Sequence, residues 1–307
     1  MRIVVLGGLG LQGQAALLDL AASPDVTDII CADATATLPS TIAGWPNMAK
    51  VKCTTVNASS KEEISSLFKH YKPQAAIDLL PQPLMRNAFE AAVESRVSIL
   101  STNYRYPLVD LDTPAREAGV VLLPECGLDP GIDLVLIGQG VREFDQVEVL
   151  NSYCGGIPEA KAAGNLLKYK ISWNWDMVLS SQMRPAVFIH EGQRLDISPA
   201  EQHEKMIHSV FFPGLGELEA LPNGNAAAYI EPLGLTSSIR ETGRYSLRWP
   251  GWCAVWRVIK GLGLLDETPV QGLPAPITPR QFLARMMEPK LHYQSDEKDL
   301  AVMVNIF

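Results

Sequence analysis

Apolar and polar positions along the first part of the chain predict short strands separated by helices. Short apolar runs predict six strands, at Ile3–Leu6, Asp28–Ala32, Val51–Val56, Ala75–Leu80, Val97–Ser101 and Val120–Pro124. Apolar residues recur at helical spacing between several of them, over Gly13–Ala22, Lys61–Tyr71, Leu84–Arg96 and Leu108–Ala118. Because such helices alternate with the strands, we expect an α/β domain with a doubly wound parallel sheet.

The pattern changes after Pro124. Strand-like stretches follow one another with little helix between them, at Gln146–Tyr153, Lys168–Trp173 and Ala186–His190. Glycine and proline become frequent, which is typical of an antiparallel or mixed sheet. We therefore predict a first domain over residues 1–126 and a second, α+β domain over residues 127–307. Residues 300–307 resemble a strand at which the chain stops, so we expect a second domain that is truncated at its C-terminus.

Composition narrows the class of protein. The chain has 307 residues, of which 47% are hydrophobic and 20% charged, and its formal net charge is −8. This acidic balance argues against a nucleic-acid partner. No apolar run approaches the ~18 residues of a membrane span, and the N-terminus lacks a signal-peptide pattern, so we expect a cytoplasmic protein with no membrane partner. The five cysteines are scattered and the histidines lack ligand spacing, so we expect neither a disulfide framework nor a metal site.

A glycine-rich segment follows the first predicted strand and opens the first predicted helix. Gly8, Gly10 and Gly13 match the pattern G-x-G-x-x-G. Glycine permits the tight turn, a close approach of the backbone to a pyrophosphate, and packing of the helix on the strand. Amide groups at the helix N-terminus then face the phosphate charge. We therefore expect the first domain to bind a dinucleotide.

An acidic residue supports this assignment and indicates which dinucleotide. Asp33 stands 20 positions after Gly13, at the end of the second predicted strand. A carboxylate there is placed to accept hydrogen bonds from the adenosine ribose. It would repel the additional phosphate of NADP, and Ala34 offers no positive charge, so we expect NAD as the cofactor. The alternative is that Asp33 is an ordinary solvated residue at a strand end.

The chain resembles the saccharopine dehydrogenase superfamily, and within it the lysine 6-dehydrogenases. Four segments carry the resemblance: Gly7–Gly13, Cys126–Asp133, Gly155–Pro158 with Leu167–Trp173, and Tyr245–Gly251. The resemblance implies hydride transfer between a nicotinamide and a carbon that bears an amine, through an imine. It also implies that the second domain holds the substrate.

The chain departs from the family pattern in one loop. Members that yield glutamate from saccharopine carry an arginine after a Pro-Asn pair, suited to a second substrate carboxylate. Here the loop reads Pro222-Asn223-Gly224-Asn225, without the arginine. The resemblance therefore implies a substrate with one carboxylate, such as lysine.

Two residues near the predicted domain boundary are candidates for catalysis. Asp129 could hold or deprotonate the substrate amine; alternatively it is the N-cap of a helix that begins at Pro130. Tyr104 follows the fifth predicted strand, at the edge of the sheet where ligands bind, and resembles a family tyrosine. Its alternative interpretation is a surface residue on a loop.

Three residues of the second domain are candidates for substrate binding. Arg240 and Arg248 could each grip an α-carboxylate with a bidentate guanidinium, or could be structural ion-pair residues. Ser246 lies between them in the sequence and could donate a hydroxyl. Lys168 and Lys170 alternate with Tyr169, so we interpret them as solvated charges on one face of a strand.

We therefore expect an NAD-dependent oxidoreductase that deaminates L-lysine at its 6-position, with an amino acid as its small-molecule partner and a homodimer as its assembly. A saccharopine or carboxyalkyl-diamine dehydrogenase is the alternative enzyme. A non-catalytic NAD-binding protein is the alternative of another class.

Overall fold

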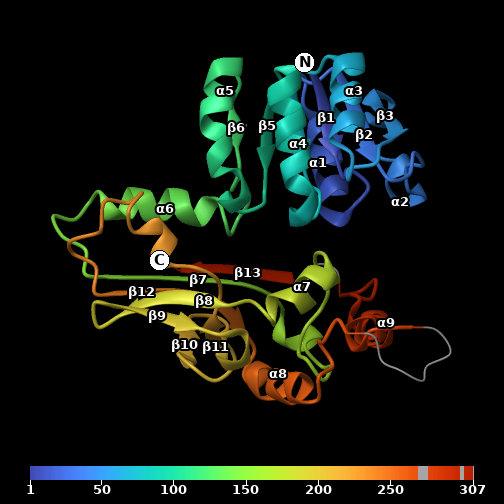
Figure 1. Ribbon diagram of the computed structural model, residues 1–307. Coiled ribbons are helices and arrows are strands. Elements are labelled where there is room, and N and C mark those ends of the chain that lie inside the picture. Colours follow the sequence, from blue (N-terminus) through green and yellow to red (C-terminus); the bar gives the residue numbers. More distant parts are fainter. Residues whose placement is uncertain (269–275, 298–300, 307) are drawn as a thin grey trace. The chain divides into compact units, whose positions relative to one another are not determined.

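The protein, seen in a computed structural model that describes residues 1–268, 276–297 and 301–306, divides into two compact units (Figure 1). The first unit is Met1–Leu134 and the second is Val135–Phe307. This division rests on compactness alone and does not test the functional domains, so the domain boundary predicted after residue 126 stays a prediction.

The first unit is built on a sheet of parallel strands. They are β1 (Arg2–Leu6), β2 (Asp28–Asp33), β3 (Val51–Thr55), β4 (Ala75–Asp78), β5 (Ser98–Ser101) and β6 (Leu122–Leu123). They pair in the order β3-β2-β1-β4-β5-β6. This is the strand order of a doubly wound dinucleotide-binding domain.

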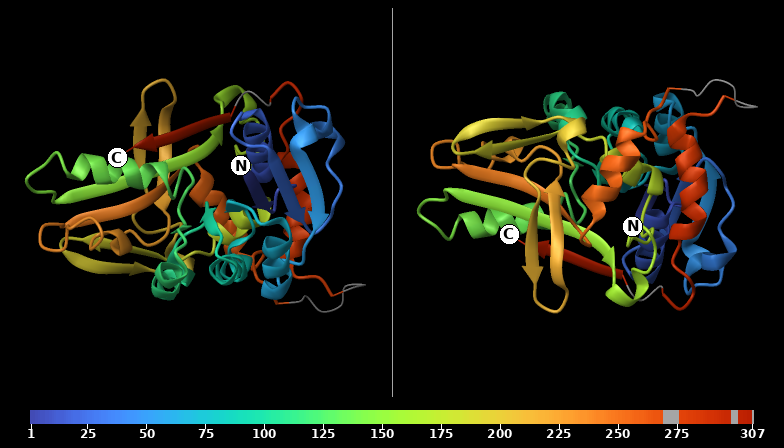
Figure 2. Two further views of the ribbon diagram at one scale, coloured as in Figure 1. Left: turned by 90° about the horizontal axis from the view of Figure 1, so that it is seen from above. Right: turned by 90° about the horizontal axis from the view of Figure 1, so that it is seen from below.

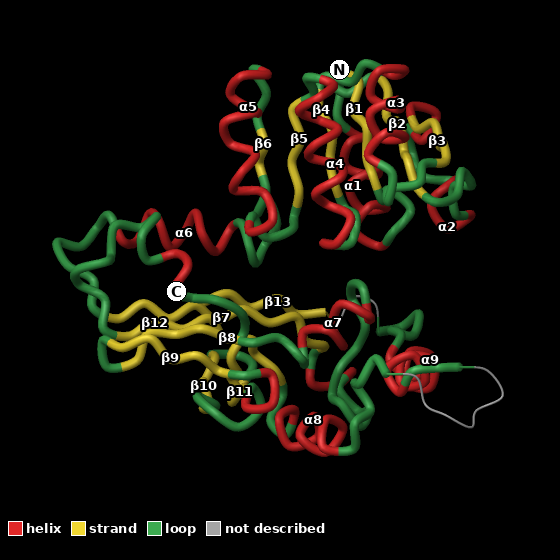
Figure 3. The backbone as a smooth tube through the Cα atoms, in the orientation of Figure 1, coloured by secondary structure: helices red, strands yellow, loops and turns green. Residues whose placement is uncertain are grey.

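Helices cover both faces of this sheet, as Figure 3 shows for the backbone. They are α1 (Leu11–Ala22), α2 (Ser40–Ala43), α3 (Lys61–Tyr71), α4 (Gln82–Ser95) and α5 (Asp112–Ala118). One core joins the sheet to α3 and α4, and a second core joins its other face to α1. The predicted doubly wound architecture is confirmed.

The helix predicted over Leu108–Ala118 is shorter than expected. Its first part is a 3₁₀ turn, Tyr106–Leu111, and α5 begins only at Asp112. Leu108 and Leu111 are both buried. Residues three apart lie on one side of a 3₁₀ turn, so this tighter helix buries both side chains together.

The second unit is built on a mixed sheet. Its strands are β7 (Val149–Pro158), β8 (Ala186–His190), β9 (Gln193–Ile197), β10 (His208–Phe212), β11 (Gly216–Pro222), β12 (Glu241–Arg248) and β13 (Ala301–Ile306). The order is β10-β11-β12-β7-β13, and β8 joins β12 to β9. Only the β12–β7 pair is parallel among these pairs. The predicted α+β domain with a mixed sheet is confirmed.

Helices α6 (Ile132–Val141), α7 (Trp175–Ser181), α8 (Trp252–Gly261) and α9 (Pro279–Leu291) complete the described α-helices. Figure 2 shows that the β10–β11 hairpin runs across the direction of the long strands β7 and β12. The strand predicted over residues 300–307 is β13, although Leu300 and Phe307 lie outside the described residues. In the described part of the chain, every helix is too short or too polar to cross a lipid bilayer.

The strand predicted over Lys168–Trp173 is wrong. The segment is a closed loop in which the Asn165 side chain takes the place of a neighbouring strand. Its Oδ1 accepts from the Tyr169 N–H, and its Nδ2 donates to the Tyr169 carbonyl. The two lysines therefore do not share a solvated face. Lys168 is exposed, whereas Lys170 is buried and pairs with Glu297.

Candidate functional site

The glycine-rich turn connects β1 to α1, and three of its glycines are required by the packing or the backbone conformation of the chain itself. A Cβ on Gly13 would lie 2.4 Å from the Gly7 carbonyl oxygen, and a Cβ on Gly8 would lie 2.7 Å from the Cys31 Sγ. Gly7 itself has a φ of +73°. A side chain at these positions would push the helix away from the turn or strain the backbone.

Gly10 differs because the chain itself does not require a glycine there. A Cβ on Gly10 would meet only the Gly7 carbonyl oxygen, at an ordinary contact distance of 3.4 Å. Gly10 is also the N-cap of α1, and it provides no side-chain acceptor for the first amides of the helix. No acidic residue stands in that first turn. Open space beside uncapped helix amides fits the close approach of a dinucleotide pyrophosphate.

Asp33 lies at the end of β2 and faces this turn. Its Oδ2 accepts a hydrogen bond from the Leu9 N–H at 2.9 Å, and its Oδ1 accepts from the Ala34 N–H at 2.7 Å. The carboxylate is half-buried and is held in one orientation against the glycine-rich segment. Each carboxylate oxygen can accept more than one hydrogen bond, so both can also receive a ribose hydroxyl.

Tyr104 and Asp129 lie together in the first unit. The Tyr104 hydroxyl donates to Asp129 Oδ1 at 3.4 Å, and both side chains are half-buried. The interpretation of Asp129 as a helix N-cap is wrong, because α6 begins only at Ile132. The buried carboxylate of Asp133 instead accepts from the Gly131 N–H at 2.6 Å. Asp129 is therefore not needed to cap the helix.

Arg248 and Ser246 lie on one face of β12 in the second unit, since residues two apart in a strand point the same way. The Arg248 guanidinium lies over two rings, 5.1 Å from the centre of Trp252 and 5.7 Å from that of Tyr169. Its Nη1 donates to the Leu247 carbonyl at 2.7 Å, and its buried Nε lacks a hydrogen-bond partner among the described residues. Burial lowers the pKa of Arg248.

The ion pair considered for Arg248 is not found among the described residues. Its aromatic neighbours attract the cation but carry no formal charge. A buried cation without a carboxylate partner is costly, and a carboxylate ligand would lower that cost.

Arg240 does not belong to the same place. It is exposed and immediately precedes β12, whereas Arg248 ends the strand. Eight residues of extended chain separate the two by about 27 Å. A single small substrate carboxylate therefore cannot be shared between Arg240 and Arg248.

Asp78 is a buried carboxyl group that was not among the predicted site residues. It ends β4 and lies opposite Ser101 of β5, at the carboxyl edge of the parallel sheet. Burial raises its pKa to about 6, against the opposing hydrogen bonds of Ser101, Leu80 and Asn103. Its Oδ2 lacks a partner among the described residues. The available signal was a single acidic residue that ends an apolar strand.

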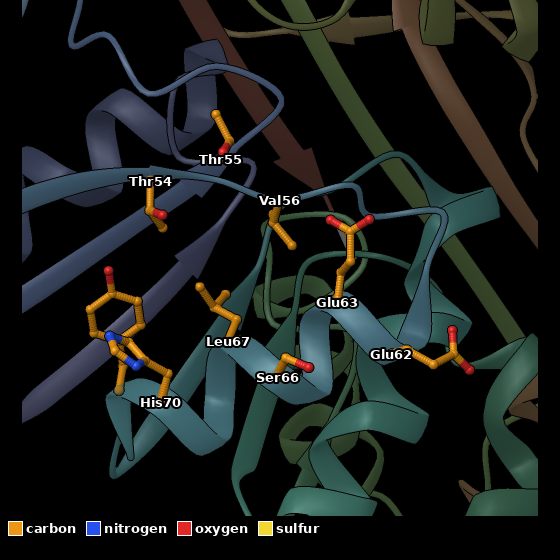
Figure 4. A pocket seen from close by; sticks show the side chains of 9 residues that line it. Thr54, Thr55, Val56, Glu62, Glu63, Ser66, Leu67 and His70 are labelled. Atoms are coloured by element: carbon orange, nitrogen blue, oxygen red, sulfur yellow. The ribbon is translucent and has the colours of Figure 1, made fainter.

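An open groove of about 440 Å³ lies between the end of β3 and α3 (Figure 4). It is lined by Thr54, Thr55, Val56, Glu62, Glu63, Ser66, Leu67, His70 and Tyr71. Glu63 also accepts from the Asn57 N–H at 3.0 Å, so this carboxylate is used to hold the entry of α3. None of the predicted cofactor residues lines the groove. The residues that the structure describes contain no cluster of side chains suited to a metal ion.

Comparison with known proteins identifies both parts of the chain. Residues 3–123 match the family model of the saccharopine dehydrogenase NADP binding domain, and residues 127–307 match that of the saccharopine dehydrogenase C-terminal domain. The apo saccharopine dehydrogenase (L-Glu forming) of Saccharomyces cerevisiae has the same fold. Its TM-score is 0.79 at 18% identity, over 99% of this chain and 85% of the yeast chain.

Two curated relatives illustrate the range of the similarity. The mitochondrial alpha-aminoadipic semialdehyde synthase of Mus musculus is 31% identical over 69% of this chain. The aligned part is 24% of the mouse protein, so this chain corresponds to about a quarter of that relative. The carboxyaminopropylagmatine dehydrogenase of a Synechocystis strain is 24% identical, over 94% of this chain and 72% of the relative. With both of its parts matched by the family's models, the chain belongs to the saccharopine dehydrogenase family.

Proposed function

We propose that the protein is an NAD-dependent oxidoreductase that acts on a carbon–nitrogen bond of an amino acid, with oxidative deamination of L-lysine at its 6-position as the reaction. The observation that carries this proposal is the pairing of Tyr104 with Asp129, a hydroxyl and a carboxylate 3.4 Å apart in a chain of this family. These are groups that can orient an amine and handle its proton.

The cofactor would be held by the glycine-rich turn and Asp33. Gly8 and Gly13 permit the turn, and Gly10 leaves room for the pyrophosphate beside the first amides of α1. Asp33, fixed by the Leu9 N–H, would accept the ribose hydroxyls. When bound, the nicotinamide supplies the hydride acceptor. The negative charge of Asp33 favours NAD over NADP, whose ribose phosphate it would repel.

Tyr104 and Asp129 would act on the substrate amine. The Asp129 carboxylate accepts an N–H of the amine and so fixes the direction of its nitrogen. The Tyr104 hydroxyl, which donates to the same carboxylate, limits the rotation of Asp129. Only an amine that has lost its additional proton has a lone pair to assist the departure of a hydride from the neighbouring carbon. Accepting the proton that the ammonium group must first lose is the task we assign to the Asp129 carboxylate.

Arg248, with Ser246 beside it, would bind the α-carboxylate. The guanidinium is already desolvated and held by two aromatic rings, so little of its entropy is lost on binding. The loop Asn223-Gly224-Asn225 lacks the arginine suited to a second carboxylate. Gly224 has a φ of +76°, which an arginine would adopt only with strain. This supports a substrate with one carboxylate.

The test is the formation of NADH by the purified protein with L-lysine and NAD, followed by absorbance. Steady turnover that is faster with NAD than with NADP, together with release of ammonia, would support the proposal. Tight binding of NADH without turnover on any amine would instead indicate a non-catalytic NAD-binding protein. Faster turnover with NADP would overturn the role of Asp33.

A carboxyalkyl-diamine dehydrogenase is the second candidate. It is favoured by the Synechocystis relative named carboxyaminopropylagmatine dehydrogenase, which matches 94% of this chain. This candidate predicts reductive activity with NADH only when a diamine and an aldehyde or keto partner are supplied together. The remaining alternative is a saccharopine dehydrogenase. It predicts that NADH forms when saccharopine replaces lysine in the oxidative assay.

A further inference from the structure

Two free cysteines face each other beneath the glycine-rich turn. Cys31 of β2 and Cys53 of β3 are directly paired positions of neighbouring parallel strands. Neighbouring strands run about 4.8 Å apart, which lies within the Cα separation of about 4.4–6.8 Å that a disulfide requires. Both side chains pack in the same core on the α1 face of the sheet.

The two thiols differ in their access to solvent. Cys31 is completely buried, and burial together with the neighbouring Cys53 raises the pKa of its thiol. Cys53 is half-buried on β3, which is the outermost strand of the described sheet. An oxidant from solvent therefore reaches Cys53 first, and Cys31 is positioned to react next.

Cys31 also supports the turn that we assign to the cofactor. Its Sγ is the atom that a Cβ on Gly8 would meet at 2.7 Å, so the thiol lies directly against that glycine. Two residues further along β2, Asp33 accepts from the Leu9 N–H. A movement of the Cys31 sulfur thus acts between two parts of the proposed dinucleotide site.

We propose that Cys31 and Cys53 form a reversible regulatory disulfide when the protein meets a peroxide. The Cys53 sulfur attacks one peroxide oxygen, which breaks the O–O bond, gives Cys53 sulfenic acid and releases water when hydrogen peroxide is the oxidant. The Cys31 sulfur then attacks the sulfenic sulfur, forms the S–S bond and releases a second water. The two thiols lose two electrons and two protons, and hydrogen peroxide is reduced to two water molecules.

The disulfide draws the Cys31 sulfur toward β3 and away from Gly8. The glycine-rich turn then loses its contact with the Cys31 sulfur, and the amides at the start of α1 that would face the pyrophosphate shift. This consequence rests on the proposed function, whereas formation of the disulfide does not. We expect the Kd for NADH to rise roughly fivefold on oxidation, as for the loss of one ordinary hydrogen bond, and to recover on reduction.

The experiment treats the whole protein with hydrogen peroxide and maps disulfides by mass spectrometry of peptides, with NADH affinity measured by fluorescence before and after. The expected result is a Cys31–Cys53 peptide pair and a dithiothreitol-reversible fall in affinity. Cys53→Ser should abolish both changes. Cys126→Ser removes an exposed thiol elsewhere, so peroxide should still produce the disulfide and the fall in NADH affinity in this variant.

Separate outcomes judge the two parts of the proposal. Unpaired Cys31 and Cys53 after peroxide treatment would overturn the disulfide. A mapped disulfide with unchanged NADH affinity would overturn its regulatory role. If the reduced protein binds no NADH, the proposed function fails, while peptide mapping still decides whether the disulfide forms.

Discussion

The Tyr104 hydroxyl donates to the Asp129 carboxylate across 25 positions of the sequence, at 3.4 Å. Backbone hydrogen bonds bring the two segments together: the Glu125 N–H donates to the Asn103 carbonyl, and the Cys126 N–H to the Ser101 carbonyl. The chain thus returns along the end of β5 just before the turn that holds Asp129. The pair is therefore set by the sheet edge and not by either residue's neighbours in sequence.

This contact predicts a strong effect on turnover. Tyr104→Phe should lower kcat by about 10- to 100-fold, and Asp129→Asn by at least as much, because both remove orientation of the amine. The double variant should be little worse than Asp129→Asn alone, since Tyr104 acts through that carboxylate. The measurements are kcat, its pH profile and NADH affinity for the three variants. A normal pH profile in Tyr104→Phe would reduce the contact to a structural one.

Asp33 should determine the choice of cofactor. Asp33→Ala should weaken NAD binding by about 1.5–3 kcal/mol through loss of its charge-assisted hydrogen bonds, and should narrow the gap to NADP. Asp28→Ala, which alters the other end of β2, is the matched control and should leave both affinities unchanged. Titration of each protein with NADH and NADPH measures the effect. An equal loss of NADH affinity in Asp33→Ala and Asp28→Ala would contradict the assignment of Asp33 to the adenosine ribose.

Arg248 should distinguish substrates that carry a carboxylate. Arg248→Lys keeps a charge but loses the bidentate fork, so the KM for lysine should rise by about tenfold. The KM for 1,5-diaminopentane, which lacks the carboxylate, should change little, and Arg248→Ala should widen the difference. Arg240→Ala, at the far end of β12, tests the other candidate arginine.

The buried position of Arg248 requires a second measurement. The guanidinium packs on Trp252 and Tyr169, so its removal also affects folding. Thermal melting of both variants separates the two roles. If losses on lysine and on the diamine are equal and the melting temperature falls, Arg248 braces the second unit and does not bind the substrate.

Asp78 should make stability depend on pH. Burial raises its pKa in the folded protein to about 6, from 3.8 for the free side chain. The proton is therefore held more tightly in the folded state, and the stability that this provides is complete below pH 3.8 and is lost as the pH rises through 6. Each pKa unit corresponds to about 1.4 kcal/mol, so the change amounts to roughly 3 kcal/mol.

Asp78→Asn removes the titration. Relative to the wild type, this variant should therefore gain up to roughly 3 kcal/mol in free energy of unfolding between pH 4 and pH 8. Urea unfolding of both proteins at the two pH values measures this difference. A constant difference across that range would contradict the raised pKa.

Local sequence patterns were sufficient for the architecture of the first unit. Its strands and longer helices follow from alternation of apolar runs with helical periodicity, whereas the short helix α2 and the 3₁₀ turn Tyr106–Leu111 were not predicted. The glycine-rich turn lies where the first strand meets the first helix. Asp33 could be placed as well, because it ends the strand that follows. In each case the side chains that specify the element are close together in the sequence.

Hydrogen bonds from side chains to the backbone, and ion pairs between residues far apart in the sequence, do not appear in such patterns. The alternation over Lys168–Trp173 predicted a strand, but the Asn165 amide closes the segment into a loop. Lys170 is then buried against Glu297, which lies 127 positions further along the chain. Periodicity cannot register a partner at that separation.

The sequence by itself determined the two-part α/β and α+β organisation, the glycine-rich turn between β1 and α1, and the family, because each depends on residues within one or two elements. Only the tertiary structure decided that Tyr104 meets Asp129, that Arg248 is buried between aromatic rings far from Arg240, and that Cys31 lies between Gly8 and Cys53. These relationships depend on which strands become neighbours. Segments far apart in the sequence compete for the same backbone hydrogen bonds and the same core, so strand pairing cannot be predicted from any single segment.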